Sequence, residues 1–338
     1  MPETQKRPPI GRFAVAALAA LVAVTGCAPQ TTPTPTGSAS SAAPTPSAPP
    51  PTAVPTPTPT PTEPADPLPD GAVTALLLGT DSRTPGSMTG NADTIMVAQI
   101  SADRESLTLV SITRDSWVSI PGAGSGKINA AFAIGGTPMM QATVSQLFGG
   151  LEIDYVVQAD FEGFIALTRA LDGFEVENQY PTTVTVNSTG RVVDFTADPV
   201  QLSGTDGLIY VRQRKGLPAG DLDRAERQRA AVIGMLERID ELATSDPAAL
   251  PELFGHFAGR LKITGELSID HMIALASLSQ QLERDDVVSL MAPIEGFGNR
   301  GGQSVNVVDV AQTAALGDAL RAGDVAPYVD QYGTAYVP

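Results

Sequence analysis

The stretch YVRQRKGLPAGDLDRAERQR, residues 210–229, is a basic window in a strongly acidic chain. The window holds six arginine and lysine side chains against three carboxylates, whereas the whole chain carries a formal net charge of -16. The guanidinium group of arginine matches the oxygens of phosphate or carboxylate bidentately, so clustered arginines in an acidic protein indicate an anion-binding site. A solvated, charged helix end is the alternative interpretation.

The segment just before the arginines is apolar. Leu208–Val211 predicts a buried strand, because a short continuous apolar run is typical of a strand covered on both faces. Arg212 and Arg214 then stand at the exit of that strand, and Lys215 is predicted to face solvent. Ligands bind at strand exits in open α/β sheets, so this placement favours a functional role for the two arginines.

The segment after the window is predicted to be a helix that begins near Asp223. Its apolar face is formed at helical spacing by Val232, Met235, Leu236 and Ile239. The same face continues toward the N-terminus through Gln228 and Arg224, because positions four apart share a face. These two side chains are therefore predicted to point inward, at the mouth of the core. Arg227 is predicted at the edge of this face, and Arg229 is predicted to face solvent.

Three further apolar runs predict strands over Val73–Gly79, Ile95–Ile100 and Leu107–Ile112, the last two pairing antiparallel across a short turn. The charged side chains beside these strands are Asp81, Arg83, Asp93, Arg114 and Asp115. Arginine suits phosphate oxygens, and aspartate suits Mg²⁺, which takes one or two carboxylates together with water and substrate phosphate. The combination predicts a pyrophosphate or phosphoryl-transfer site that works by positioning and charge neutralisation. Structural ion pairs within the fold are the alternative.

The rest of the folded part mixes strand-like and helix-like segments. Strands are predicted over 153–158, 174–177 and 287–291, and a β-hairpin is predicted over 180–200. Helices are predicted over 138–148, 161–171 and 308–321, and near 248–260 and 268–283. The glycine-rich segments 118–126 and 296–303 are predicted to be loops. The length and this mixture predict one large α/β domain over residues 71–338.

The first 70 residues are predicted to tether this domain. Residues 1–26 combine a basic start with an apolar run too short to span a bilayer, which is typical of a signal peptide. Cys27, the only cysteine, ends the lipobox-like VTGC and is predicted to be lipidated; an uncleaved anchor with an incidental cysteine is the alternative. Residues 27–70 are rich in proline, threonine and serine, which predicts a disordered linker with a reach of roughly 100 Å. Either way, the domain is expected outside the cytoplasmic membrane and held to it.

Composition disfavours several other functions. The acidic charge argues against nucleic-acid binding. With His256 and His271 as the only histidines, a Ser-His-Asp triad has little support, and with a single cysteine neither a cysteine nucleophile nor a zinc cluster is expected. The chain has no GxxxxGK[ST] loop and no GxGxxG after a strand, which disfavours nucleotide binding.

Seven segments together resemble the LytR-CpsA-Psr family of cell-wall ligases over about residues 71–322. They are LLLGTDSR (76–83), ADTIMV (92–97), SITRDSWVSIPG (111–122), KINAAFAIGG (127–136), IDYVVQADFEGF (153–164), LSGTDGLIYVRQR (202–214) and DLDRAERQR (221–229). Their order and spacing are specific as a set. The resemblance implies an α/β/α fold, a mixed central β-sheet sandwiched between helices, with an apolar tunnel for a lipid.

The resemblance also implies an activity and its residues. The implied enzyme transfers a glycopolymer from a polyprenyl-pyrophosphate carrier to peptidoglycan, depends on Mg²⁺ or Mn²⁺, and has a pyrophosphatase side activity. The implied metal ligands are Asp81 and Asp93. The implied pyrophosphate-binding residues are Arg83, Arg114, Arg212, Arg214, Arg224, Arg227 and Gln228. The implied catalytic set is Arg83, Asp93, Arg114, Arg212, Arg214 and Arg224, with Asp115 as a weaker candidate that orients Arg114.

The sequence departs from the family pattern at two positions next to the expected site. Asn91 stands where the family usually has arginine, and Thr113 stands where it usually has proline. The first departure keeps one alternative open, a non-catalytic protein of the same fold that binds prenyl lipid or wall polymer. A lipoprotein solute receptor with two hinged lobes and no apolar tunnel is a second alternative.

Overall fold

The structure is a computed structural model that describes residues 68–82, 90–246, 253, 260–265, 271 and 282–335. The predictions for the signal peptide, Cys27 and nearly all of the linker lie outside the described residues. So does Arg83, and so do most of the helices predicted near 248–260 and 268–283. Within the described part of the chain, no helix combines the length and the apolar character needed to cross a membrane.

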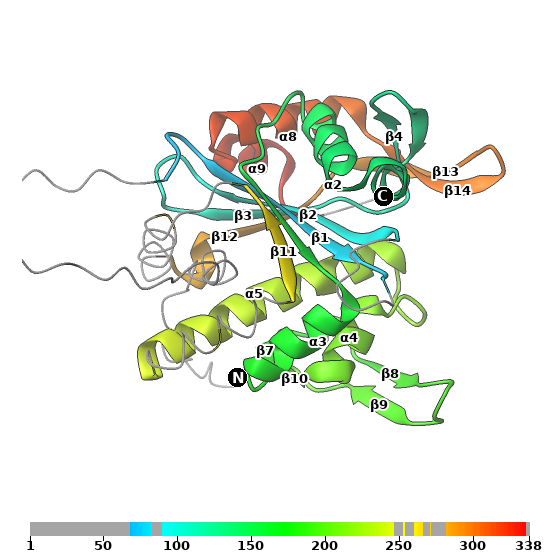
Figure 1. The fold of residues 1–338 in the computed structure, drawn as a ribbon, viewed down its shortest axis with the longest axis vertical. Helices are drawn as coiled ribbons and strands as arrows, with labels where there is room; N and C mark the ends of the chain where they lie inside the picture. Colours follow the sequence, from blue (N-terminus) through cyan, green and yellow to red (C-terminus); the bar gives the residue numbers. More distant parts are fainter. Residues whose placement is uncertain are drawn as a thin grey trace, which may run out of the picture. The chain divides into compact units, whose positions relative to one another are not determined.

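A mixed six-stranded sheet forms the centre of the fold, in the order β11-β6-β1-β2-β3-β12 (Figure 1). Its strands are β11 (Leu261–Thr264), β6 (Tyr155–Ala159), β1 (Val73–Thr80), β2 (Ala92–Ile100), β3 (Leu107–Ser111) and β12 (Val287–Met291). β1 pairs parallel with β6, and β3 pairs parallel with β12. The other three pairs are antiparallel, which confirms the pairing predicted for the second and third strands of the chain.

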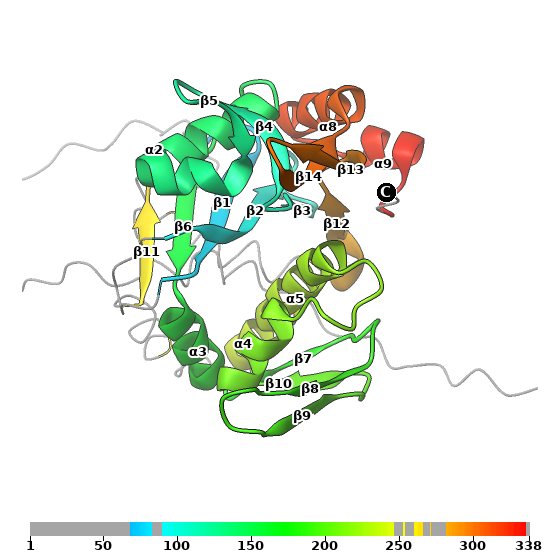
Figure 2. The ribbon, with the colours of Figure 1, turned by 90° about the vertical axis from the view of Figure 1, so that its right-hand side faces the viewer.

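Helices cover both faces of this sheet (Figures 1 and 2). One face carries α2 (Ile128–Leu147), α8 (Val310–Ala322) and α9 (Ala326–Tyr332), and the other carries α3 (Phe161–Ala170) and α5 (Asp221–Ser245). Alternate residues of β1 serve the two cores, with Ala75 in the α5-side core and Leu76 and Leu78 in the α2-side core. This two-sided burial explains the continuous apolar run of β1 and confirms the predicted α/β/α architecture.

Beyond α5 lie two short β-pairs and the helix α4 (Gly204–Arg212) (Figure 2). The β-pairs are β7 (Phe174–Val176) with β10 (Val200–Leu202), and β8 (Thr182–Thr185) with β9 (Val192–Phe195), the predicted hairpin. The strand predicted over Leu208–Val211 is wrong, because these residues form the end of α4. Gly207, Tyr210 and Val211 are buried at helical spacing, a pattern that a four-residue apolar run does not reveal.

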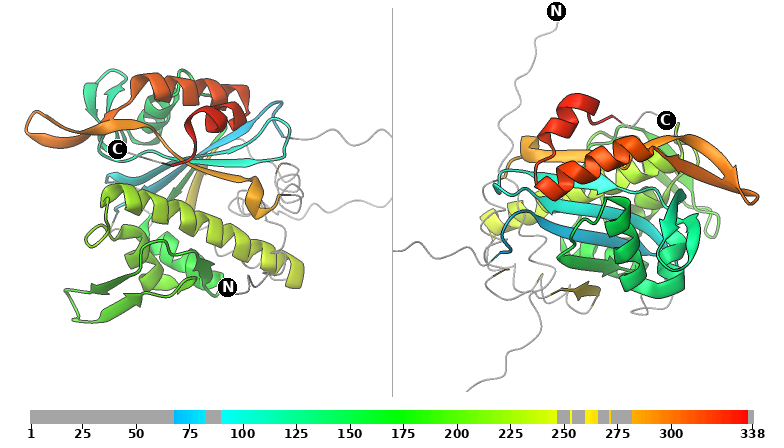
Figure 3. Two further views of the ribbon diagram at one scale, coloured as in Figure 1. Left: turned by 180° about the vertical axis from the view of Figure 1, so that it is seen from behind. Right: turned by 90° about the horizontal axis from the view of Figure 1, so that it is seen from above.

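A second sheet has the order β13-β14-β4-β5. Its strands are β13 (Ile294–Arg300), β14 (Gln303–Val308), β4 (Ser116–Ile120) and β5 (Gly124–Lys127). Figure 3 shows the β13–β14 hairpin projecting from the domain. The loops predicted over 118–126 and 296–303 are therefore wrong. The glycines that suggested loops instead provide turns with positive φ, at Gly122 and Gly124 in one hairpin and at Gly301 and Gly302 in the other.

A groove of about 1160 Å³ is lined by residues of α5, β7 and neighbouring segments and is rich in carboxylates. Its acidic side chains are Asp172, Glu175, Glu177, Asp198, Glu226, Glu237, Asp240 and Glu241. The side chain of Asp240 is buried, with the residue 9% exposed. Burial, and to a lesser extent the charge of Glu241, raises the pKa of the Asp240 carboxyl to about 6. Folding therefore disfavours the charged form of this group.

Replacing Asp240 by asparagine is expected to change how stability depends on pH. A carboxyl whose pKa is higher in the folded than in the unfolded protein contributes stability at low pH that is lost as pH rises through the folded value. Relative to the wild type, Asp240→Asn should therefore gain on the order of 2 kcal/mol in free energy of unfolding between pH 4 and pH 7. Urea titrations at several pH values measure this difference. Glu295→Gln, on the exposed part of β13, is the control, and an equal gain in both variants would contradict the assignment to Asp240.

Candidate functional site

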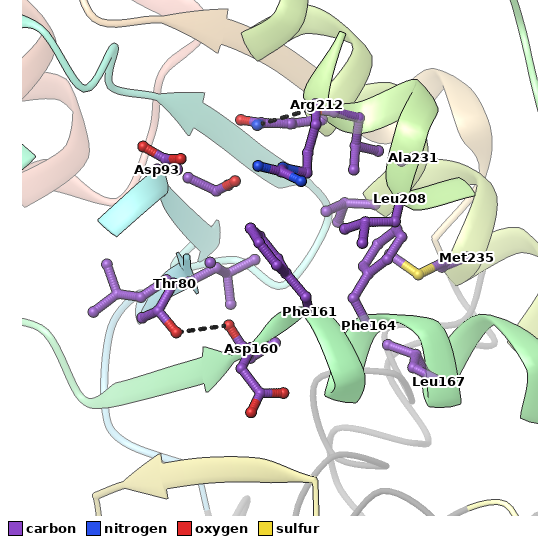
Figure 4. Close-up of a pocket in the computed structure, with 18 of the residues that line it drawn as sticks. Thr80, Asp93, Asp160, Phe161, Phe164, Leu167, Leu208, Arg212, Ala231 and Met235 are labelled. Carbon is purple, nitrogen blue, oxygen red and sulfur yellow. Dashed lines mark hydrogen bonds between the residues drawn. The ribbon is translucent and has the colours of Figure 1, made fainter. Parts of the chain in front are cut away.

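A cavity of about 360 Å³ lies between the sheet and the helices α3, α4 and α5 (Figure 4). Most of its wall is apolar. The apolar lining includes Leu77, Val157, Phe161, Phe164, Leu167, Leu208, Val211, Ala231, Val232, Met235, Leu236, Ile239 and Leu261. The predicted inward face of α5 thus forms one wall, which confirms the predicted direction of the Arg224–Gln228 face.

The mouth of this cavity is charged. The polar residues that line it include Asp93, Arg114, Arg212, Arg214, Arg224 and Gln228, all of them predicted site residues from four separate segments of the chain. Asp93 enters from the start of β2 and Arg114 from the end of β3, because antiparallel pairing brings these two ends to the same edge of the sheet. The arginine-rich window reaches the same point from the end of α4 and the start of α5.

Arg114 and Asp93 form the shortest ion pair at the mouth. The Arg114 Nη1 atom donates to the Asp93 Oδ1 atom at 2.6 Å, and both side chains are about one-fifth exposed. Burial by itself would lower the pKa of Arg114, but the hydrogen bond and charge of Asp93, with the charges of Asp221 and Asp115, outweigh it and raise that pKa. Arg114 is therefore a permanently charged group held at a fixed place.

Asp221, in the first turn of α5, is a member of the cluster that was not among the predicted site residues. Its Oδ1 atom lies 2.8 Å from Arg224 Nη2, 3.6 Å from Arg214 Nη1 and 3.9 Å from Arg114 Nε. Both of its carboxylate oxygens are buried without a well-aligned hydrogen bond to any described residue, as are the Nε atoms of Arg114 and Arg224. Burial lowers the pKa of Arg224, and the charge of Asp221 opposes that shift. The cluster thus holds buried polar atoms that ligand groups can satisfy.

Phe161 is a second contributor that the sequence did not reveal. The Arg212 guanidinium carbon lies 4.1 Å from the centre of the Phe161 ring, a cation–π contact. Figure 4 shows the Arg212 side chain next to the Phe161 ring, with Asp93 on one side and the apolar Phe164 and Leu208 on the other. Phe161 is the first residue of α3, whose N-cap Asp160 accepts a hydrogen bond from the backbone N–H of Gly163. Its position at a helix start therefore comes from local capping.

Arg227 does not join the mouth cluster. Its guanidinium donates to Gln213 Oε1 at 2.8 Å and to the carbonyl oxygen of Tyr180 at 2.5 Å. It also donates to the Thr182 hydroxyl at 3.0 Å and stacks 4.1 Å above the centre of the Tyr210 ring. These contacts tie α5 to α4 and to β8, so the structure places Arg227 in a buried support network on another face of α5.

Two further predictions for the window have different outcomes. Lys215 is exposed, as predicted. The prediction that Arg229 faces solvent is wrong, because this residue is only 2% exposed and its Nε atom donates to the Ser289 hydroxyl at 2.7 Å. Ser289 belongs to β12, which covers the face of α5 that the helical pattern left for solvent.

Gln228 and Asp81 both contact backbone. Gln228 Nε2 donates to the carbonyl oxygen of Val211 at 3.2 Å, which links α5 to the end of α4. Asp81 Oδ1 accepts from the backbone N–H of Asn91 at 2.8 Å, next to the start of β2. Within the described ranges, no group of three or more histidine, cysteine or acidic side chains is arranged to hold a metal ion.

Known proteins are similar to this chain in sequence. The family model LytR_cpsA_psr matches residues 52–321. The chain is 33% identical over 205 residues to the polyisoprenyl-teichoic acid–peptidoglycan teichoic acid transferase TagU of Enterococcus faecalis, covering 60% of this chain and 64% of TagU. It is 32% identical over 262 residues to the probable cell wall biosynthesis protein LcpB of Corynebacterium glutamicum, covering 73% of this chain and 60% of LcpB. The matched regions therefore span less than two thirds of the length of these relatives.

Solved structures show the same fold. The protein gbs0355 of Streptococcus agalactiae superposes with a TM-score of 0.65 at 23% identity, over 75% of this chain and 88% of that one. TagV of B. subtilis superposes with a TM-score of 0.64 at 20% identity, over 80% of this chain and 100% of that one. The sheet order, the two helical layers and the family match agree, and the chain belongs to the LytR_cpsA_psr family.

Proposed function

We propose that this protein transfers a glycopolymer from a polyprenyl-pyrophosphate carrier to peptidoglycan. The observation that carries the proposal is the junction of an apolar cavity with an arginine-rich mouth. A prenyl pyrophosphate has the same two-part chemistry, an apolar chain followed directly by a compact anion. The related TagU is named as a transferase of teichoic acid from a polyisoprenyl carrier to peptidoglycan, which supports the same class of donor and acceptor.

The arginines are proposed to bind the pyrophosphate of the donor. Arg114 and Arg224 are held by Asp93 and Asp221, and Arg212 is held by Phe161, so the three guanidinium groups keep their places before the ligand arrives. In the proposed reaction, an acceptor hydroxyl oxygen forms a bond to the phosphorus that carries the glycan. The bond from that phosphorus to the bridging oxygen breaks, polyprenyl phosphate leaves with that oxygen, and the hydroxyl proton passes to the leaving phosphate or to solvent. Fixed cations at this point would stabilise the charge that develops on the phosphoryl oxygens.

Mg²⁺, or Mn²⁺ in its place, is the proposed cofactor. Mg²⁺ typically takes one or two carboxylates and completes its shell with water and phosphate oxygens. Asp93 and Asp221 lie within the arginine cluster, and both oxygens of Asp221 lack a well-aligned hydrogen bond among the described residues. One or two of these carboxylates, completed by water and donor phosphate oxygens, would hold such an ion, and Asp81 stays a predicted ligand. When bound, the ion would neutralise part of the pyrophosphate charge.

The proposal extends to the surroundings of the enzyme. We propose lipidation at Cys27 and a place on the extracellular face of the cell membrane, with the proline-rich linker carrying the domain toward the cell wall. Hydrolysis of the pyrophosphate, with water in place of the acceptor hydroxyl, is the proposed side activity. Asn91 keeps the non-catalytic alternative open, whereas the hinged two-lobe receptor does not match the central sheet with its two helical layers.

The direct test is a transfer assay with three components. Purified protein would be incubated with a polyprenyl-pyrophosphate-linked oligosaccharide, peptidoglycan and Mg²⁺, and the products separated into wall-bound glycan and free polyprenyl phosphate. Formation of both products, and their loss on adding a chelator, supports the proposed reaction and cofactor. Donor binding without either product would favour the non-catalytic alternative.

Filling the cavity is expected to weaken binding of the lipid. Val232 lines the cavity from α5, so Val232→Trp should place an indole ring where the prenyl chain would lie. We expect at least a tenfold loss of affinity, or about 1.4 kcal/mol, for a polyprenyl phosphate, since the chain loses buried apolar contact. Isothermal titration measures this change. Val192→Trp, at a position on β9 that is 60% exposed, is the control, and equal affinity in both variants would place the lipid elsewhere.

A further inference from the structure

Residues from the far end of the chain hold the loop that carries Arg114. This loop, residues 112–115, connects β3 to β4, and β14 lies beside β4 with Asn306 in register with Ser116, the first residue of β4. We propose that Asn306, Thr113 and Ser116 act as a positioning network that fixes Arg114 for the transfer reaction. This inference rests on the proposed function and assigns the reaction new supporting residues.

Three hydrogen bonds define the network. Asn306 Nδ2 donates to the Thr113 hydroxyl at 2.7 Å, and the Thr113 and Ser116 hydroxyl oxygens share a hydrogen bond of 2.7 Å. The backbone N–H of Asn306 donates to the carbonyl oxygen of Asp115 at 2.9 Å. Asn306 therefore holds the loop on both sides of Arg114. Before Arg114 it binds the side chain of Thr113, and after Arg114 it binds the backbone of Asp115.

Burial makes these bonds specific. Thr113 is 2% exposed, Ser116 is 1% exposed and Asn306 is 5% exposed. A buried hydroxyl or amide that loses its partner costs about 1–3 kcal/mol, so alternative loop conformations that break the network are disfavoured. A buried network of this kind selects one conformation of the loop.

The rest of the loop is held as well. The carbonyl oxygen of Arg114 accepts from the backbone N–H of Asn129 at 3.3 Å, and the side chain of Asp115 forms an ion pair with Lys127 at 2.8 Å. Arg114 is thus the residue of the loop whose side chain is directed to the mouth of the cavity. Fixing the backbone on both sides limits where its guanidinium group can lie relative to the donor phosphates.

Thr113 has a clear place in this scheme. Its hydroxyl accepts from Asn306 and shares a hydrogen bond with the Ser116 hydroxyl, so Thr113 links Asn306 to Ser116. The hairpin β13–β14 contributes none of the described residues that line the cavity. Through Asn306, however, it supports Arg114, which does line it.

The test compares three matched threonine variants by transfer kinetics. Thr113→Val keeps the side-chain shape and removes the hydroxyl, and it should lower kcat about 10- to 100-fold with a smaller change in KM, since misplacement of a fixed charge by about 1 Å has effects of this size. Thr113→Ser keeps the hydroxyl and should recover most of the loss. Thr108→Val removes a buried hydroxyl on β3 away from the network and should leave kcat within about twofold of the wild type.

A structural measurement tests the network independently of activity. The Arg114 Nε atom is buried, so its N–H signal should be observable by nitrogen-15 NMR and assignable from its absence in Arg114→Lys. The signal should shift or broaden in Thr113→Val and match the wild type in Thr113→Ser. An unchanged signal, with kcat equal to that of Thr108→Val, overturns the inference. A wild-type protein without transfer activity would refute the proposed function, while the NMR result would still decide the network.

A second variant tests the same network at another residue, in case Thr113→Val does not fold. Asn306→Ala removes the amide and leaves the backbone N–H that binds Asp115. If the network acts as a unit, the effects of the two substitutions on the Arg114 signal and on kcat should be strongly non-additive in the double variant. Additive effects would overturn the inference.

Discussion

Replacing Arg114 by alanine is expected to lower the rate of glycopolymer transfer by about 10²–10³-fold, the usual effect of removing one fixed charge-stabilising donor from an active site. Arg114 lies at the mouth of the cavity, where Asp93 holds its Nη1 atom at 2.6 Å. The substitution removes one cation from the place proposed for the pyrophosphate and leaves Asp93 without its main partner. Both changes make the site more negative where the donor is negative. The transfer assay with purified variant measures this loss as kcat/KM.

A charge-matched control separates this local effect from a general one. Arg300→Ala removes one positive charge from the exposed end of β13 and should leave transfer within about twofold of the wild type. Arg114→Lys should give an intermediate rate, because lysine keeps the charge but not the fork of donors. If Arg114→Ala retained more than a tenth of the wild-type kcat/KM, a direct role for Arg114 in the reaction would be untenable.

Replacing Gly234 by alanine is expected to destabilise the fold by about 3 kcal/mol, although alanine is the better helix former by about 1 kcal/mol. Gly234 lies within α5, where β7 crosses close to the helix. A Cβ atom at this position would overlap the carbonyl oxygen of Glu175 and lie 3.1 Å from the ring of Phe174. Since the obstacle is backbone, relief requires β7 to move away from α5. Urea denaturation measures the resulting loss in free energy of unfolding.

Gly207→Ala is the matched control in a neighbouring helix. A Cβ atom at Gly207 would meet its nearest neighbour, the ring of Phe164, at 3.6 Å, an ordinary contact distance. The same substitution should therefore be neutral or stabilising by up to about 1 kcal/mol, as helix propensity alone predicts. Equal effects at the two positions would show that the close approach of β7 does not limit the packing of α5.

Much of this fold was predictable because its signals are local. The continuous apolar run of β1 arises from cores on both faces of the sheet, and such a run is visible in the sequence. The inward direction of Arg224 and Gln228 followed from helical spacing along α5, since the positions that define it are close in the chain. The convergence of Asp93 and Arg114 followed from one short antiparallel connection between β2 and β3.

The failures share a different cause, which is packing between distant segments. The apolar run Leu208–Val211 is compatible with either a buried strand or a buried helix. It forms a helix because it packs against α3 and α5. Arg229 is buried because β12 covers it. Arg227 lies away from the cavity because its guanidinium group contacts β8 and the ring of Tyr210. Asp221 resembles any acidic residue in a first helical turn, and only the positions of three arginines reveal its place in the site.

The contact between Asn306 and the loop of Arg114 has a consequence for when the site comes into being during folding. Asn306 is separated from Thr113 by 193 positions, and β12, which covers Arg229, also comes late in the chain. Contacts of such long sequence separation form slowly, because a large loop must close before they contribute any stability. A growing chain that already contains every arginine of the mouth still lacks β14, the strand whose Asn306 holds the loop of Arg114. We therefore expect the site to be completed late in folding, so that a partly made chain carries its charged residues without their final arrangement.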